Sequence, residues 1–316
     1  MDLQMATPRL LDQHALVIGA NGFIGRHVVR RLLAEGAAVR IMDISPATQE
    51  CSQLEQVTGS VADTELMASA VDGVDLVIYL ANSSLPGSAS DDLSGEVTAH
   101  VAVTVKAAEI CAQKVLKRFL FASSGGTVYG ASSEAPLKED SPTRPRNAYG
   151  ASKLSIEHYL SLLRRERGLI TLPLRISNPY GSGQRALRSQ GFIAAAMQHA
   201  VEGTQLSIWG DGSVQRDFLH ISDLAEAFVA AALAEDPPEV VNIGSGRAVS
   251  LREVLEQVEA AVGRKIDVTY APGRHVDVAR NVLDITRARE TLGWEPQVSL
   301  GEGLARTAKW WLERSE

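Results

Sequence analysis

A tyrosine and a lysine four residues apart form the pair in this chain best suited to acid–base chemistry. Residues 149–153 read YGASK, and side chains at i and i+4 lie on one face of a helix. The Lys153 ammonium can then stabilise the Tyr149 phenolate. Lowering the phenol pKa from about 10 to about 7 takes roughly 4 kcal/mol, which a cation in a desolvated site can supply. The spacing predicts a catalytic pair; the alternative is an ordinary surface helix face.

A glycine-rich turn stands at the first strand-to-helix boundary that the sequence predicts. Residues 19–25 read GANGFIG, with the spacing G-x-x-G-x-x-G directly after the apolar run 15–19. Such glycines permit a tight turn, close approach of the backbone to a pyrophosphate and close packing of the helix, whose N-terminus offers free N–H groups to phosphate. We expect a dinucleotide to contact this turn at Gly19, Gly22, Phe23, Ile24 and Gly25. A purely structural turn is the alternative.

An acidic residue, Asp43, ends the second predicted strand, residues 38–43. A carboxylate at this place accepts hydrogen bonds from the adenosine ribose hydroxyls and repels a 2′-phosphate. The residues that follow, Ile44, Ser45 and Pro46, include no arginine that would attract such a phosphate. The sequence therefore favours NAD over NADP, although a solvated aspartate that caps a loop remains the alternative.

The first half of the chain alternates short apolar runs with amphipathic stretches. Glycine-bounded strands separated by helices predict βαβ crossovers and a parallel sheet, and continuously apolar strands predict helices on both faces of that sheet. We therefore expect an α/β fold with a Rossmann-type, doubly wound parallel sheet. Its strands are expected at residues 15–19, 38–43, 54–58, 74–80, 118–123 and 170–176, and its longest helices at about 95–113 and 148–167.

The pattern loosens after about residue 177, where short strands mix with helices. We expect an NAD-binding domain over residues 1–176 and a smaller α+β substrate domain over 177–316, with the chain returning to the first domain near 216–246. The expected strands here are 205–208, 240–243 and 266–270, and the expected helices are 192–202, 223–234, 251–262 and 304–314.

Composition narrows the classes of partner. The 316 residues include 31 Lys and Arg against 38 Asp and Glu, a formal net charge of −7. That balance argues against a nucleic-acid protein, which usually carries a basic stripe, and against docking on an acidic membrane. The chain shows no export signal and no apolar run of roughly 18 residues that could span a membrane, and Cys51 and Cys111 are too few for a disulfide framework. We expect a cytoplasmic protein without a metal site.

Several ordered motifs resemble one known family over nearly the whole chain. They are GANGFIG at 19–25, SSGGTVYG at 123–130, YGASK at 149–153, LRISNPYG at 174–181, RDFLHISD at 216–223, NIGSG at 242–246 and LGWEP at 292–296. The chain resembles the extended short-chain dehydrogenase/reductase family, in its NAD-dependent nucleotide-sugar epimerase/dehydratase branch. Within that branch it is most similar to the UDP-glucose 4-epimerases.

The resemblance implies a role for particular residues. Tyr149 would be the catalytic base and acid, while Lys153 would bind the nicotinamide ribose. Further cofactor contacts would come from Ser60, Val61, Leu80 and Ala81. Asn178 and Arg216 would hold the sugar nucleotide, with Arg216 at the diphosphate, where a guanidinium fork suits phosphate oxygens. Arg274 and Asp277 would contact the diphosphate and the nucleoside ribose, and Trp209 would lie beside the nucleobase. The alternatives are a surface ion pair of Arg216 with Asp217 and a place in the core for Trp209.

The chain departs from the family pattern at two places near the expected chemistry. Gly125 stands where a Ser or Thr usually binds the reacting sugar hydroxyl, so we expect Ser124 or Thr127 to replace it, with Thr127 preferred. His100 stands where an Asn is usual. The family's dehydratases carry acidic residues just before VYG, whereas residues 125–127 here read GGT, so elimination of water is disfavoured.

The expected activity is inversion of C4 of a UDP-sugar, or a dTDP-sugar, through a transient 4-keto intermediate. An NAD-dependent nucleotide-sugar reductase or dehydratase is the alternative enzyme, and a non-catalytic dinucleotide-binding module on the same fold is the alternative class. Asn281 stands where a residue of these epimerases limits the room around the sugar C2 substituent. Since Asn is smaller than Tyr, an N-acetylated sugar would fit there; an ordinary loop residue is the alternative. Relatives commonly pair through their two long helices, so we expect a homodimer.

Overall fold

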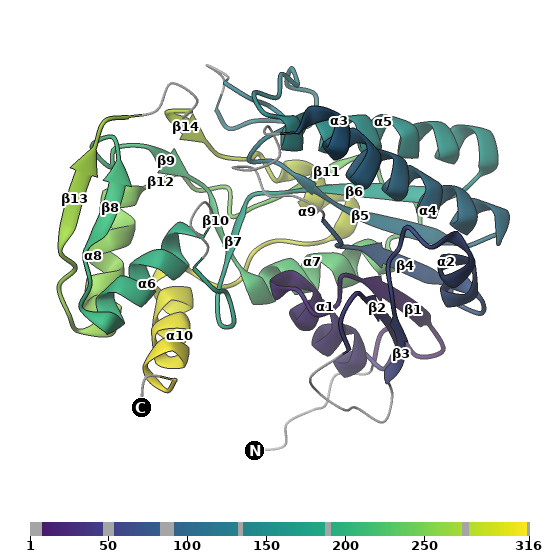
Figure 1. Ribbon diagram of the computed structural model, residues 1–316, viewed down its shortest axis with the longest axis horizontal. Helices are drawn as coiled ribbons and strands as arrows, with labels where there is room; N and C mark the ends of the chain where they lie inside the picture. Colours follow the sequence, from purple (N-terminus) through teal and green to yellow (C-terminus); the bar gives the residue numbers. More distant parts are fainter. Residues whose placement is uncertain are drawn as a thin grey trace.

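Short apolar segments pair into one seven-stranded sheet, in the order β11-β6-β5-β4-β1-β2-β3 (Figure 1). The computed structural model describes residues 8–46, 54–82, 92–131, 135–186, 191–273 and 278–314. Every pairing in this sheet is parallel. The strands are β1 (His14–Ile18), β2 (Ala38–Asp43), β3 (Leu54–Thr58), β4 (Leu76–Tyr79), β5 (Arg118–Ser124), β6 (Ile170–Ile176) and β11 (Val241–Ile243).

The order of the strands reverses at β1, which pairs with β2 on one side and with β4 on the other. In open parallel sheets, ligands bind outside the carboxyl ends of the strands at such a reversal. The turn after β1 and the segment after β4 therefore border the same crevice. This architecture confirms the doubly wound α/β fold that the sequence predicts.

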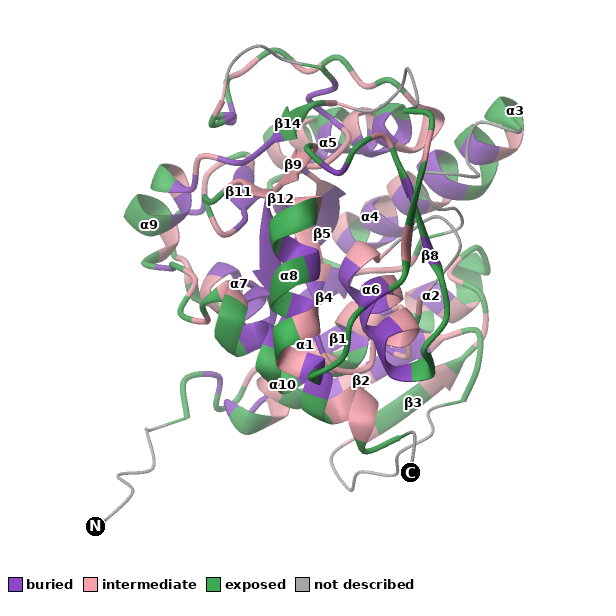
Figure 2. Ribbon diagram, turned by 90° about the vertical axis from the view of Figure 1, so that its left-hand side faces the viewer, coloured by how far each residue is buried: buried purple, intermediate pink, exposed green. Residues whose placement is uncertain are grey.

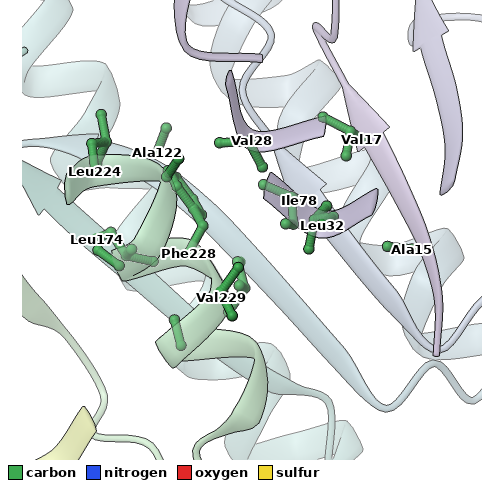
Figure 3. Close-up of a cluster of buried hydrophobic side chains, with 14 of the residues drawn as sticks. Ala15, Val17, Val28, Leu32, Ile78, Ala122, Leu174, Leu224, Phe228 and Val229 are labelled. Carbon is green, nitrogen blue, oxygen red and sulfur yellow. The ribbon is translucent and has the colours of Figure 1, made fainter. Parts of the chain in front are cut away.

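Helices cover both faces of the sheet. On one face, α1 (Phe23–Ala34) packs beside α7 (Ile221–Leu233). Figure 3 shows Val28 and Leu32 of α1 near the strand residue Ile78, and Phe228 of α7 near the strand residue Leu174. The other face is covered by α2 (Thr64–Val71), α4 (Val103–Gln113) and α5 (Ala148–Arg167). The central strands β4, β5 and β6 are almost entirely buried between these layers, as their continuous apolar runs predict, whereas the edge strand β3 is not.

A smaller region lies beside the carboxyl ends of the main sheet (Figure 1). Its parallel pair, β8 (Leu206–Trp209) with β13 (Val268–Ala271), packs with α6 (Phe192–Glu202), α8 (Leu251–Val262) and α10 (Leu300–Leu312) around a separate apolar core. Figure 2 shows the exposed and buried sides of α8. Very short strands join the regions: β7 (Asn178–Tyr180), β9 (Gln215–Arg216), β10 (Phe218–His220), β12 (Val249–Ser250) and β14 (Arg280–Asn281).

The helix expected at 95–113 differs from the prediction in its winding. It begins as α3 (Leu93–Glu96), continues as a π-helix, η1 (Val97–Ala102), and becomes regular again as α4. Such π turns occur often at functional sites. The remaining helix, α9 (Thr286–Leu292), packs on β11 and α7. No helix in the described part of the chain is both long and apolar enough to cross a membrane.

Candidate functional site

A cavity of about 1650 Å³ opens along the carboxyl ends of the parallel strands. At one end it is bordered by the glycine turn after β1, and at the other by β8 of the smaller region. Tyr149 and Lys153 lie between these ends, together with the last residues of β5. The cavity thus joins the expected cofactor turn to the expected substrate side.

The glycine turn is shaped by backbone contacts that exclude side chains. Gly19 has a φ of +82°, and a Cβ there would lie 2.7 Å from the backbone nitrogen of Ala81. At Gly25 a Cβ would lie 2.3 Å from the carbonyl oxygen of Gly19, so the helix packs directly on the turn. Gly22 is the N-cap of α1, makes no side-chain cap, and is followed by a first turn without acidic residues. Backbone N–H groups and the positive end of the helix therefore suit the pyrophosphate of a dinucleotide.

Asp43 is held at the same end of the cavity by the turn itself. Its Oδ2 accepts a hydrogen bond from the backbone N–H of Asn21 at 2.9 Å. Ser60 and Val61 line the cavity after β3, and Leu80 and Ala81 line it after β4. The structure thus places these sequence-predicted cofactor residues around one end of one cavity.

The tyrosine–lysine pair lies on the first turns of α5. Asn147 caps this helix by accepting a hydrogen bond from the Gly150 N–H at 2.8 Å. The Nζ of Lys153 donates to the carbonyl oxygen of Ala122 at 2.9 Å and lies 5.4 Å from the centroid of the Tyr149 ring. Since Lys153 is only 2% exposed, its ammonium is held against the end of β5 and close to the phenol.

Burial dominates the protonation of both groups. Burial, with a smaller contribution from the Glu96 carboxylate, raises the pKa of Tyr149 to about 12, against a hydrogen bond with Asn82 that lowers it. Burial also lowers the pKa of Lys153 to about 7, against the opposing effects of Glu96 and Glu157. The spacing predicts a lowered pKa for Tyr149, but the surrounding protein groups do not lower it. The cost of desolvating the phenolate exceeds the stabilisation that these groups provide.

The glycine at position 125 is required by its neighbours. A Cβ at Gly125 would lie 2.6 Å from Leu283 Cδ1 and 3.1 Å from the carbonyl oxygen of Arg175. Leu283 is fully buried, so it cannot move aside easily. Asn281, expected near the sugar, is also buried, and its Nδ2 donates to the carbonyl oxygen of Gly125 at 3.2 Å.

Both replacement hydroxyls reach the cavity. Ser124 ends β5 and Thr127 lies in the turn that follows, and each lines the cavity beside Tyr149. The Oγ1 of Thr127 is buried and has no hydrogen-bond partner among the described residues. A buried hydroxyl without a partner is costly, so a ligand hydroxyl that bonds Thr127 would remove that cost.

The substrate side brings together three of the five predicted residues. Asn178 Nδ2 donates to the carbonyl oxygen of Asp217 at 2.9 Å, and Arg216 Nη1 donates to that of Val278 at 2.7 Å. Trp209 lines the cavity and is 52% exposed, so it is not a core residue. Arg274 and Asp277 lie outside the described residues.

A buried ion pair beneath the site was not predicted from the sequence. Arg175 on β6 forms hydrogen bonds to both carboxylate oxygens of Glu157 on α5, the shortest at 2.7 Å. Ser123 also donates to Glu157, and Arg175 donates to the Tyr129 hydroxyl at 3.0 Å. The pair ties β5, β6 and the tyrosine helix together. Its one sequence signal is the position of Glu157, a helical turn after Lys153.

Comparisons with known proteins agree with this geometry. Residues 15–244 match the NAD dependent epimerase/dehydratase family. The chain is 33% identical over 310 residues to a UDP-glucose 4-epimerase of Mycolicibacterium smegmatis, covering 95% of this chain and 99% of that protein. It is 30% identical over 304 residues to a dTDP-4-dehydro-6-deoxyglucose reductase of Escherichia coli, covering 93% and 96%.

A solved structure has the same architecture throughout. The crystal structure of UDP-glucose 4-epimerase with UDP-glucose, from Thermotoga maritima, matches with a TM-score of 0.91 at 30% identity and covers 96% of this chain and all of that one. The glycine turn, in which two glycines leave no room for a side chain, independently fits a dinucleotide. The chain belongs to the NAD-dependent epimerase/dehydratase family of extended short-chain dehydrogenases/reductases, and its cofactor is NAD.

Proposed function

We propose that the protein is a nucleotide-sugar 4-epimerase that acts on a UDP-sugar. Within the family, the carboxylates that line the cavity favour this reaction. Among the described residues that line the cavity, Asp43 is the only carboxylate, and it lies at the glycine-turn end. Elimination of water needs an acid and a base beside the sugar, whereas exchange of a hydride at C4 needs only Tyr149 and the cofactor. The site therefore favours epimerisation over dehydration.

In the proposed reaction, Tyr149 removes the proton from the C4 hydroxyl of the sugar. Thr127 holds that hydroxyl by a hydrogen bond, and Lys153 holds its charge close to the phenol. Bound NAD supplies a hydride acceptor and donor. Because the protein's contribution is orientation and electrostatics, the important feature is that Tyr149 stays fixed while the sugar presents first one face and then the other.

The sugar must turn between the two steps while its nucleotide stays bound. We assign the diphosphate to Arg216 and to Arg274, and the nucleoside ribose to Asp277, which lies with Arg274 in the segment of the sequence before β14. Asn178 and Trp209 would hold the sugar and the nucleobase at the β8 end of the cavity. The UDP-glucose bound in the Thermotoga maritima relative supports UDP as the nucleotide, while the name of the Escherichia coli reductase keeps dTDP as the second choice.

We also propose a homodimer formed through the surface of the two long helical segments, α3–η1–α4 and α5. Large apolar side chains are exposed there, with Leu93 62%, Val97 57%, Tyr159 48% and Leu162 39% exposed. Exposed apolar residues that gather on one surface are typical of protein–protein interfaces. The partner subunit would then stabilise α3 and the first turns of α5, which carry Tyr149 and Lys153.

The proposed activity is tested by incubating the purified protein with a panel of UDP- and dTDP-sugars and following the anomeric signals by NMR, without added NAD. A 4-epimerase gives a new signal of the C4 epimer and approaches the same equilibrium mixture from either sugar. A net reductase would instead convert a 4-keto sugar only when NADH is added, in stoichiometric amounts. A binding module would leave every sugar unchanged while holding NAD.

A further inference from the structure

A buried glutamate with an unpartnered oxygen lies on α3, which packs against the helix of Tyr149 and Lys153. Glu96 ends α3 and is 5% exposed. Its Oε1 is buried and has no hydrogen-bond partner among the described residues. A buried carboxylate without a full set of partners is costly to keep, so its presence here needs a reason beyond packing.

The surrounding elements place this carboxylate next to the site. Both α3 and η1 pack against α5, the helix that carries Tyr149 and Lys153. The charge of Glu96 acts on both side chains, raising the pKa of Tyr149 and that of Lys153. The chain winds as a π-helix directly after Glu96, which sets the face that η1 turns towards the cavity.

Two other titratable residues, His100 and Glu157, lie near Lys153 on the elements that surround it. On η1, His100 lines the cavity, and burial with the nearby Lys153 lowers its pKa to about 3, so it is neutral. On α5, Glu157 also raises the pKa of Lys153, but its carboxylate is bonded to Arg175. Glu96 is therefore the negative group near Lys153 that has an oxygen without a hydrogen-bond partner in the described structure.

We propose that Glu96 is a positioning residue that acts through Lys153 and Tyr149, by balancing the lysine ammonium in the buried site so that the lysine keeps its proton while the phenol gains and loses one. This role rests on the proposed function of Tyr149 as acid and base. Phenolate, ammonium and carboxylate together carry one negative charge, which complements the cationic ring of oxidised NAD. When Tyr149 is protonated the set is neutral, which complements the uncharged reduced ring.

Replacing Glu96 by Gln removes one negative charge near Tyr149 and Lys153. In Glu96→Gln the phenolate of Tyr149 loses a repelling neighbour, so the pKa of Tyr149 falls. The ammonium of Lys153 loses an attracting neighbour, so the pKa of Lys153 falls as well. The two limbs of a bell-shaped pH–rate profile report such groups, and here both limbs move to lower pH, by about one unit.

The test compares Glu96→Gln, Glu96→Asp and the control Glu166→Gln, which removes an exposed carboxylate from the far end of α5. Each NAD-loaded protein is titrated by ultraviolet difference spectroscopy for phenolate, with its own Tyr149→Phe derivative subtracted. The pH profile of kcat is then measured separately. In Glu96→Gln both the phenolate transition and the kcat profile are expected about one pH unit lower, with Glu96→Asp between that variant and the parent and Glu166→Gln unchanged.

Unshifted curves in Glu96→Gln, or curves shifted to higher pH, would overturn the proposal even if kcat falls, because a purely structural residue lowers the rate without moving the titration. If Glu96→Gln does not fold, Glu96→Asp decides in the same way: a smaller shift to lower pH supports the role and no shift overturns it. The phenolate titration needs no substrate. A protein that epimerises no sugar but shows the shift would therefore contradict the proposed function and not the role of Glu96.

Discussion

At Tyr149 the surrounding protein works against the ionisation that a base requires. Burial and the Glu96 carboxylate raise the pKa of the phenol to about 12, although Lys153 lies 5.4 Å from the ring centroid. A phenol that is hard to ionise in the protein alone becomes a base only when positive charge is added beside it. In the proposed reaction, proton removal by Tyr149 would therefore depend on the charge of bound oxidised NAD.

Replacing Tyr149 by Phe removes the proposed base and leaves the shape of the site unchanged. We expect kcat to fall by about 10²–10⁴-fold, the usual contribution of a general acid–base group, with NAD still bound. Turnover by NMR and NAD content by mass spectrometry of the denatured protein check the two parts. Tyr270→Phe, an exposed tyrosine on β13 that does not line the cavity, is the control and should keep full activity. Near-normal turnover in Tyr149→Phe would contradict the assignment.

Thr127 and Ser124 compete for the role of the hydroxyl that Gly125 lacks. Since the Oγ1 of Thr127 is buried without a partner among the described residues, we expect Thr127→Val to lower kcat more than Ser124→Ala does. The loss of a hydrogen bond to a charged or reacting group costs about 1.5–3 kcal/mol, which is about 10–100-fold in rate. Steady-state kinetics of both variants decide the matter, and a larger loss in Ser124→Ala would reverse the assignment.

At the scale of the elements, the Arg175–Glu157 pair connects β6 to the tyrosine helix. Arg175→Met would leave the Glu157 carboxylate buried and unpaired, which costs about 3–5 kcal/mol. Denaturant unfolding measures this loss. The matched control is Arg289→Met, which breaks the exposed pair with Glu295 and should cost less than about 1 kcal/mol. Equal losses in the two variants would show that the buried pair does not stabilise the fold.

The sequence predicts the elements well where one periodicity is sustained. The apolar runs at 15–19, 38–43 and 170–176 become β1, β2 and β6 of the parallel sheet, and the glycine turn lies where the first run meets its helix. Strands of two or three residues, such as β9 and β14, are too short to show a pattern. Their pairing depends on contacts with distant segments.

The parts of the site that depend on residue type and local spacing can be predicted from the sequence. Glycine spacing and the Tyr149–Lys153 spacing locate the cofactor turn and the reacting pair, because local geometry alone relates those residues. The π turn, the burial of Glu96 and the bonding of Arg175 to Glu157 depend on packing between helices and strands. The Tyr149–Lys153 spacing suggests a lowered pKa for Tyr149, but burial in the folded protein raises that pKa instead.

For the whole molecule, the proposed dimer is tested with two leucines of equal exposure. Leu162 on α5 and Leu233 on α7 are each 39% exposed but lie on helices that cover opposite faces of the sheet. A charge inside an apolar interface is costly to bury, so Leu162→Glu should give a monomer and Leu233→Glu a dimer. Light scattering after size exclusion measures both masses. A dimer that survives Leu162→Glu would move the interface elsewhere.

In the proposed reaction a hydride leaves C4 of the sugar and returns to the same carbon within one bound complex. UDP-glucose that carries deuterium at C4, incubated with the purified protein without added NAD and followed by NMR, reveals the fate of that hydride. We expect UDP-galactose that retains the deuterium at C4, with none in the solvent. Product that carries hydrogen at C4, or a keto or deoxy sugar released into solution, would contradict the proposed reaction.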